Sequence, residues 1–236
     1  MSACGNLPSI SVILCPKSLV DSSPGLLGRY YAARHSHGQY RSCAVTGVYY
    51  FDGQDFQNFQ KHLIEFLKFS LGKTIERHPA LCYGLLEKTK NSEAQFVRLQ
   101  TIRWEDIVEI HTSTSEDKVV ALPKVLGLGH QHLFKDQRQK PAWKIIVLLH
   151  DNGSLTSNSS FRADIISHHA IADGISGSAF HKTLLEAFYQ ASLHSKSQNG
   201  WPYLVPPSSL EPLAIEKAFP FTQGISAPST NTGTVQ

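Results

Sequence analysis

The sequence has few of the residues that mark secreted, nucleic-acid-binding or membrane proteins. Its four cysteines are dispersed over 236 residues and form no C-x-x-C pair, which argues against a small disulfide-stapled fold and favours reduced thiols. Its 22 lysines and arginines are scattered and the formal net charge is +3, so we expect no nucleic-acid partner. No segment approaches the roughly 18 apolar residues of a membrane span, and we find no secretion signal. We therefore expect an intracellular, cytoplasmic protein, with peripheral membrane association left open.

Hydrophobic residues make up 41% of the chain, enough to bury a core in one large domain or two small ones. Apolar residues at three-and-four spacing predict helices over 24–36, 55–78 and 175–194. Runs of β-branched and aromatic residues predict strands over 43–51, 81–86, 94–101, 143–150 and 161–167. The segment 104–133 gives mixed signals. Beyond residue 199, several prolines and then a Ser/Thr-rich end predict an extended crossover and a loose tail.

The predicted elements carry some detail. The first helix is expected to be capped by Ser23, to end at Gly38 and to bury one stripe of residues, namely Leu26, Leu27, Tyr30 and Tyr31. The last helix is expected to bury Ala179, Leu184, Leu185 and Phe188. The nearly all-apolar run 143–150 predicts a strand covered on both faces. The short connection that follows it predicts that 161–167 pairs with it antiparallel.

The stretch from Ser167 to Gly177 reads SHHAIADGISG and lies between a predicted strand and a predicted helix. Because successive strand residues face opposite sides, His168 and His169 should point in opposite directions. One imidazole would enter the interior, and the other could serve as a general base. Asp173, at the helix entry, could accept backbone N–H bonds or pair with an arginine, and Gly174 permits a tight backbone. The candidate arginines are Arg29, Arg34 and Arg162.

Other histidines come in pairs that could suggest a metal site. His130 and His132 lie in GHQH, and His35 and His37 lie in HSH. Without cysteines or a second ligand pair at suitable spacing, we interpret both pairs as surface loop residues. We therefore expect no metal, and the sequence assigns no cofactor-binding residue.

The motif H-H-x-x-x-D-G resembles the signature of the acyltransferase superfamily with the chloramphenicol-acetyltransferase-like fold, which includes condensation domains. His168, His169, Asp173 and Gly174 match its fixed positions. The segments ERHPAL, LGRYYAARHSHG and VPPSSLEPL are similar to the fungal alcohol O-acetyltransferase branch. The resemblance covers about 26–216, and the seven-residue motif is its specific part.

The resemblance implies an α/β fold of the chloramphenicol-acetyltransferase type, with a mixed, largely antiparallel sheet flanked by helices. It implies that His169 is the general base and that His168, Asp173 and Gly174 support the site. It implies acetyl-CoA as co-substrate, an alcohol as acceptor and no permanently bound cofactor. Ser176 is a candidate oxyanion donor by position. The acceptor is open: a simple alcohol, a sterol and a secondary-metabolite hydroxyl all fit.

Members of this superfamily have two similar domains, with the motif in the first. We expect 1–198 to form that first domain, 199–236 to be the crossover segment and tail, and the second domain to be missing from the chain. An exposed inter-domain face would then favour self-association. Two alternatives to an alcohol acetyltransferase, or its N-terminal half, are a condensation-type domain that uses carrier-protein thioesters and a non-catalytic binding module.

Overall fold

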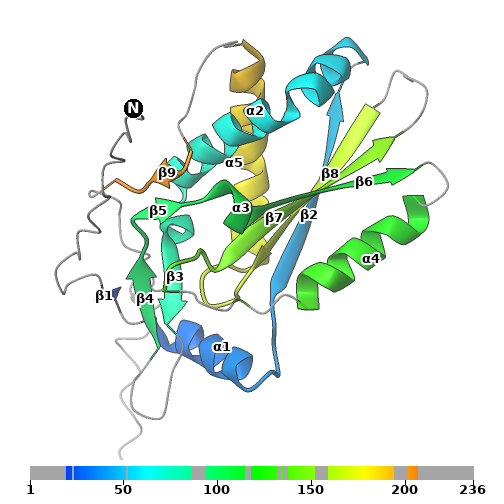
Figure 1. Ribbon diagram of the computed structural model, residues 1–236. Helices are drawn as coiled ribbons and strands as arrows, with labels where there is room; N and C mark the ends of the chain where they lie inside the picture. Colours follow the sequence, from blue (N-terminus) through cyan, green and yellow to red (C-terminus); the bar gives the residue numbers. More distant parts are fainter. Residues whose placement is uncertain are drawn as a thin grey trace, which may run out of the picture.

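The computed structural model in Figure 1 describes a defined part of the chain. The described residues are 20–22, 24–51, 53–86, 94–114, 118–131, 134, 138–151, 159–193 and 201–206. Several features named in the sequence analysis lie outside them: the Ser23 cap, His132, the end of the last predicted helix at His194, the segment 207–236, Cys4 and Cys15.

Helices and strands alternate through most of the described chain. In order they are β1 Val20–Ser22, α1 Leu26–Ser36, β2 Cys43–Phe51, α2 Gly53–Arg77, the 3-10 helix η1 Pro79–Cys82, β3 Tyr83–Leu86, β4 Gln95–Arg98, β5 Thr101–Ile102, α3 Trp104–Ile107, β6 Val108–Thr114, α4 Lys118–Gln131, β7 Trp143–Asp151, β8 Ser159–Ser167, α5 Gly174–Leu193 and β9 Tyr203–Leu204.

The main sheet has the strand order β2-β8-β7-β6. β8 pairs antiparallel with both β2 and β7, whereas β6 pairs parallel with β7. Two smaller sheets, β1-β4-β3 and β5-β9, lie at its side. The predicted mixed, largely antiparallel sheet flanked by helices is confirmed, and so is the antiparallel pairing of β7 and β8.

Helices cover both faces of the main sheet (Figure 1). On one face, α2 and α5 contribute Leu67, Leu71 and Leu184 to a core that also contains Ile145 and Val147 of β7. On the other face, α4 packs over the alternate residues of the same strands. Alternation along β7 therefore supplies both cores, and residues 143–148 are all buried, as predicted for a strand covered on both faces. Each buried Leu, Ile or Val side chain contributes about 1.5–3 kcal/mol.

The face under α4 also contains polar groups. The Thr46 hydroxyl donates a hydrogen bond to the Asp164 carboxyl group, which is fully buried in the middle of β8. Burial raises the pKa of Asp164 above its ordinary value. At the sheet edge, the buried Lys144 ammonium group lies 2.8 Å from a carboxylate oxygen of Glu109. Both polar pairs thus lie on the α4 side of the sheet.

The helix faces differ from the predicted ones. The N-cap of α1 is Gly25, and Leu26, Leu27 and Tyr30 of the predicted buried stripe are exposed. The buried residues of α1 are Ala32 and His35. In α5, Phe180, Leu184, Ala187, Phe188 and Ala191 are buried, whereas the expected Ala179 and Leu185 are exposed. The apolar spacing located these helices correctly, but the neighbouring elements decide which side is covered.

The segment 104–133 is more regular than its mixed signals suggested. It contains α3, β6 and α4, so His130 lies on a helix and the loop interpretation of GHQH is wrong for it. α4 includes Pro123 and two glycines that ordinarily discourage a helix. A Cβ at Gly129 would lie 2.1 Å from Ile166 Cδ1, so this glycine lets α4 approach the sheet closely. Packing against β8 explains why the helix forms despite its sequence.

Candidate active site

The turn that carries the H-H-x-x-x-D-G motif joins β8 to α5. β8 ends at Ser167, which pairs with Cys43 of β2 and Trp143 of β7, so the turn leaves the centre of the sheet. The His168 N–H donates to the Ala142 carbonyl at 2.8 Å, and this bond extends the sheet contact by one residue. The motif therefore starts from a backbone that is held on both sides.

The His168 side chain points into the protein and is 1% exposed. Its Nδ1 accepts a hydrogen bond from the Ala170 N–H at 3.0 Å, so the ring shapes the turn that follows it. The His35 ring lies 4.4 Å away between centroids. Burial, and then the neighbouring His35 and His169, lower the pKa of His168 to about 3. The imidazole is neutral at physiological pH, as suits an interior residue.

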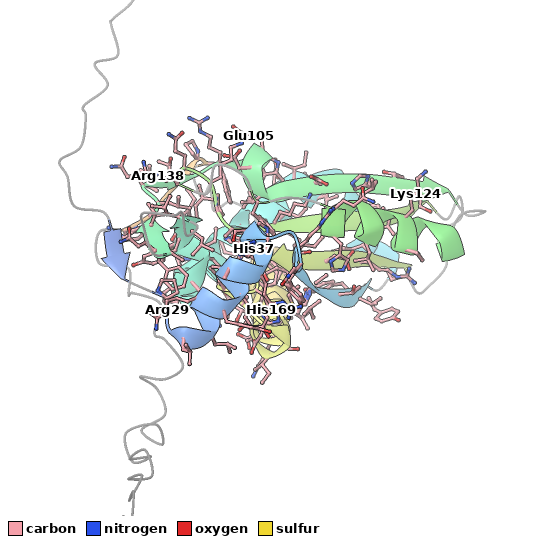
Figure 2. The ribbon with its side chains drawn as sticks, turned by 90° about the horizontal axis from the view of Figure 1, so that it is seen from below. Arg29, His37, Glu105, Lys124, Arg138 and His169 are labelled. Atoms are coloured by element: carbon pink, nitrogen blue, oxygen red, sulfur yellow. The ribbon has the colours of Figure 1, made fainter. Side chains whose placement is uncertain are left out.

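The next side chain, His169, is half-buried. Figure 2 shows it beside α1 and α5. Its ring stacks face to face on Tyr31 of α1, with centroids 3.9 Å apart and planes 1° apart. Tyr40 lies at 5.2 Å and is tilted by 50°. Within the described part of the chain, the buried Nδ1 of His169 has no hydrogen-bond partner. The structure thus buries the first imidazole in the interior and leaves the second half-buried against tyrosine rings.

Asp173 forms the N-cap of α5. Its carboxylate accepts hydrogen bonds from the Ser176 N–H at 2.8 Å and from the Ser176 hydroxyl at 2.7 Å. Its carbonyl accepts the Gly177 N–H at 2.9 Å. These bonds, first the one from the backbone N–H, lower the pKa of Asp173. Of the two roles considered for Asp173, the structure supports the acceptor of a backbone N–H at the helix entry.

The candidate arginines lie elsewhere. Among the described residues, Asp173 forms no ion pair with an arginine. Arg34 donates to the Tyr30 hydroxyl at 3.2 Å and lies over the Tyr40 ring. Arg162 lies within β8, opposite Val48, and Arg29 is exposed on α1. Asp173 is itself exposed, so it is not one half of a buried ion pair.

Two expectations about the start of α5 change with the geometry. The Ser176 hydroxyl already donates to Asp173, so its proton is used in capping and its assignment as an oxyanion donor is not supported. A Cβ at Gly174 would meet nothing within 4 Å, so the expected steric reason for this glycine is wrong. The close approach occurs at Gly177 instead, where a Cβ would lie 2.4 Å from Val45 Cγ2.

Several residues around the motif were missed by sequence reasoning. His35 was interpreted as a surface loop residue, but it is buried at the end of α1 beside His168. Tyr31 and Tyr40 surround His169. Cys43 begins β2 nearby, and burial, followed by the Asp173 charge, raises the pKa of its thiol. The only signal was the cluster of aromatic residues and histidines in LGRYYAARHSHG. His37, by contrast, is exposed as expected.

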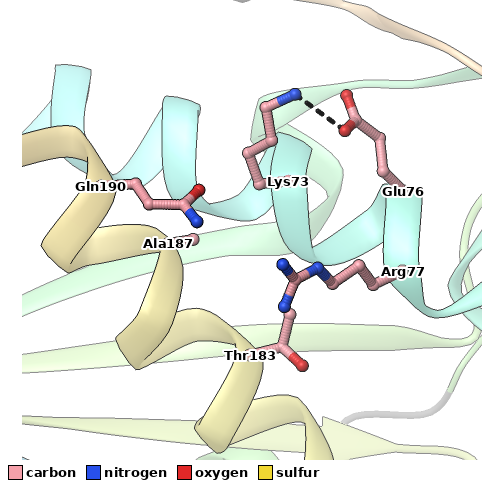
Figure 3. Close-up of a pocket in the computed structure, with 6 residues that line it drawn as sticks. All are labelled: Lys73, Glu76, Arg77, Thr183, Ala187 and Gln190. Carbon is pink, nitrogen blue, oxygen red and sulfur yellow. Dashed lines mark hydrogen bonds and ion pairs between the residues drawn. The ribbon is translucent and has the colours of Figure 1, made fainter. Parts of the chain in front are cut away.

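A cavity of about 260 Å³ lies between α2 and α5 (Figure 3). Its lining residues are Lys73, Glu76, Arg77, Thr183, Ala187 and Gln190. Lys73 pairs with Glu76 at 2.9 Å, and Arg77 pairs with Glu186 at 2.5 Å. The lining contains no motif residue and both cations are already paired, so this cavity is separate from the histidine site.

The described residues contain no cluster of three or more histidine, cysteine or acidic side chains arranged to hold a metal ion. No helix among them combines the length and apolar character needed to cross a membrane.

Comparison with known proteins adds to this geometry. Residues 119–209, which include the motif, match the family model "Alcohol acetyltransferase". The Aspergillus fumigatus protein named "Probable alcohol acetyltransferase crmB" is 36% identical over 81 residues, which are 34% of this chain and 16% of that protein. This chain thus matches only a small part of the length of its relative.

Solved structures are similar over a longer stretch. The epimerization domain from the third module of tyrocidine synthetase B has a TM-score of 0.51 and 16% identity, over 86% of this chain and 40% of that one. The X-domain in complex with OxyB from teicoplanin biosynthesis has a TM-score of 0.49 and 18% identity, over 92% and 40%. The chain therefore shares its fold with condensation and chloramphenicol-acetyltransferase-like domains, as predicted. Residues 119–209 are thus similar to the alcohol acetyltransferase family, as the motif predicted.

Proposed function

We propose that this chain contributes the general base of an acyl-CoA-dependent O-acyltransferase. In this reaction His169 removes the proton of an alcohol hydroxyl, and the oxygen attacks the thioester carbonyl of acetyl-CoA. The carbon–sulfur bond then breaks, and the proton is passed to the departing CoA sulfur, so an acetyl ester and free CoA are formed. A positioned imidazole typically contributes about 10²- to 10⁴-fold in rate.

The observation that carries this proposal is the contrast between the two motif histidines. His168 is buried, neutral and hydrogen-bonded to the turn, which supports a structural role. His169 is half-buried on the other side, where a ligand has access that the interior does not offer. The family match supplies the acyltransferase chemistry. Asp173 would support the site by capping α5, which fixes the far end of the turn.

We further propose that 1–198 is the first domain of a two-domain enzyme and that 199–236 contains the crossover segment, of which residues 201–206 pack on the first domain through β9 and the buried Val205. The chain spans 40% of the tyrocidine synthetase domain that shares its fold, which supports this division. Exposed apolar residues flank the motif turn on both sides: Leu26, Leu27 and Tyr30 on α1 and Ile175 on α5. Such a surface suits contact with a further domain or a second copy of the chain.

The direct test measures acetyl transfer from radiolabelled acetyl-CoA to a panel of alcohols, using the purified chain alone and mixed with the second domain of a related enzyme. Wild type is compared with His169→Ala and with His37→Ala, a control that removes an exposed histidine. Ester formation that is lost only in His169→Ala supports the proposal. Full activity of His169→Ala would contradict it. If the chain binds acetyl-CoA but transfers no acetyl group, either alone or with the second domain, the binding-module alternative is favoured.

A further inference from the structure

The imidazole of His169 is held by aromatic contact. Its ring and the Tyr31 ring are parallel within 1° and 3.9 Å apart, which is the geometry of direct face-to-face contact. Tyr40 lies beside the same two rings, at 5.2 Å from His169 and 5.6 Å from Tyr31. Two tyrosines therefore limit the positions that this imidazole can occupy.

This arrangement matters because no described residue orients the His169 ring through a hydrogen bond to Nδ1. In many sites a carboxylate or carbonyl accepts a hydrogen bond from the second ring nitrogen and so fixes the ring. Here Nδ1 of His169 is buried, and no described residue is its hydrogen-bond partner. The Asp173 carboxylate, the nearest acid in the motif, is bonded to Ser176 instead. Ring contact is thus what restricts rotation of the His169 side chain.

Tyr31 is itself presented by a helix that is fixed against the motif turn. Ala32, the next residue of α1, is fully buried. One turn further on, the His35 ring packs on His168 at 4.4 Å. At Gly28 the helix comes close to the turn, since a Cβ there would lie 3.5 Å from the Ala170 carbonyl oxygen. α1 therefore contacts the motif at three levels, and Tyr31 lies between the other two.

We infer that Tyr31 is a positioning residue, whose ring holds the His169 imidazole in the orientation needed to take a proton from the acceptor hydroxyl. The inference rests on the proposed function of His169. The property of Tyr31 that this role requires is the flat aromatic face rather than the phenol hydroxyl. Phenylalanine at position 31 should therefore keep the His169 orientation, whereas leucine, which has no ring, should lose it.

The first experiment uses NMR spectroscopy on the purified chain and needs no turnover. The His169 ring protons are assigned with a His169→Gln variant. In wild type they should show an upfield ring-current shift and cross-relaxation with the Tyr31 ring protons. The shift should be lost in Tyr31→Leu, kept in Tyr31→Phe, and kept in Tyr30→Leu, a control on the same helix whose ring packs edge-on against Tyr31. A wild-type spectrum without shift or cross-relaxation overturns the inference, whether or not the leucine variant folds.

The second experiment measures acetyl transfer under the conditions in which wild type is active. Because small misplacements of a reacting group can cost about 100-fold, we expect Tyr31→Leu to lower kcat by roughly 10- to 100-fold with little change in KM, and Tyr31→Phe to restore it. If Tyr31→Leu is as active as wild type while His169→Ala is inactive, the inference fails and the proposed function stands. If His169→Ala is fully active, the proposed function fails, whatever the spectra show.

Discussion

The motif turn has an inner side, which contains His168 and Gly177, and an outer side, which contains His169 and Asp173. On the inner side, the histidine is 1% exposed and the glycine lies against Val45. On the outer side, the histidine is half-buried against tyrosine rings and the aspartate is exposed. One step along the chain thus separates a side chain that stabilises the fold from one that is able to meet a ligand.

The two histidines also differ in what their ring nitrogens contact. Burial among apolar residues and beside His35 keeps the His168 imidazole neutral, and its Nδ1 is used by the Ala170 N–H. His169 has aromatic contacts, and its Nδ1 has no hydrogen-bond partner among the described residues. The inner ring therefore serves local structure, while the outer ring is held by aromatic contacts and remains partly exposed.

The different roles of His168 and His169 can be tested by removing each ring separately. We expect His169→Ala to lower the acyl-transfer rate by about 100-fold or more, since general bases contribute 10²- to 10⁴-fold. Its free energy of unfolding should fall by only about 0.5–1.5 kcal/mol, because the ring stacks on Tyr31 but is only half-buried. His168→Ala should lose roughly 2–3 kcal/mol of stability, because it leaves a cavity and an unpaired N–H. Kinetics and chemical denaturation of both variants decide. An active His169→Ala beside a stable but inactive His168→Ala would reverse the two roles.

Acidification tests the inner side of the turn through the buried His168. The pKa of His168 is about 3 in the folded protein and near 6.5 when unfolded. The unfolded chain therefore binds the proton first, and stability falls as the pH drops from 6.5 towards 3. Each pH unit costs about 1.4 kcal/mol, on the order of 5 kcal/mol over the whole range.

The measurement is urea denaturation between pH 7 and 5. His168→Asn is the matched variant, because its amide oxygen can accept the Ala170 N–H but does not titrate. Burial also lowers the pKa of His78 and His181, so the difference between the two proteins, rather than the slope of either, isolates His168. Parallel pH profiles for wild type and His168→Asn would show that this ring is not a buried neutral group.

The strands were the most predictable part of the fold. The predicted bounds of β2 are those observed, and β7 and β8 differ by one or two residues, because long apolar or β-branched runs record burial directly. α4 was not predicted, since Pro123 and the glycines are local signals against a helix. Gly129 suits the helix only because α4 packs closely on Ile166, a residue distant in sequence. Local patterns cannot contain that information.

In the candidate site, too, features that depend on neighbouring residues were predictable, and contacts between distant residues were not. Alternation of consecutive residues predicted different surroundings for His168 and His169, and their burial does differ, although β8 ends at Ser167 just before them. The contacts of Tyr31 with His169 and of His35 with His168 join α1 to a turn far away in the chain. The sequence pattern placed Tyr31 in a stripe with Leu26 and Leu27, whose exposure shows that tertiary contacts chose a different side of the helix.

Gly174 and Gly177, in the first turn of α5, extend the comparison of the two sides to the backbone. A Cβ at Gly177 would lie 2.4 Å from Val45 Cγ2 and 2.7 Å from Val45 Cβ, so Gly177→Ala should cost about 1–3 kcal/mol through overpacking of α5 on β2. Gly174→Ala is the matched control, because its Cβ would meet open space and should be neutral or stabilising by up to about 1 kcal/mol. Thermal denaturation of both variants is the measurement. Equal losses would mean that α5 does not approach β2 this closely.

The smallest expected effect concerns the outer side, where Asp173 caps α5. Asp173→Ala removes the acceptor for the Ser176 N–H and should cost about 1 kcal/mol, within the 0.5–2 kcal/mol range of N-caps. Asp173→Asn keeps an acceptor oxygen and should cost less.

The two variants also differ from wild type in their dependence on pH. Because its hydrogen bonds lower the pKa of Asp173, the contribution of its charge is present above the ordinary carboxyl pKa and is lost as the pH falls through the lowered folded value. Chemical denaturation at pH 7 and near pH 3 measures this contribution. A loss of 3 kcal/mol or more in Asp173→Ala at pH 7, with no rescue by asparagine, would indicate a buried ion pair and would move Asp173 from the outer side of the turn to the inner one.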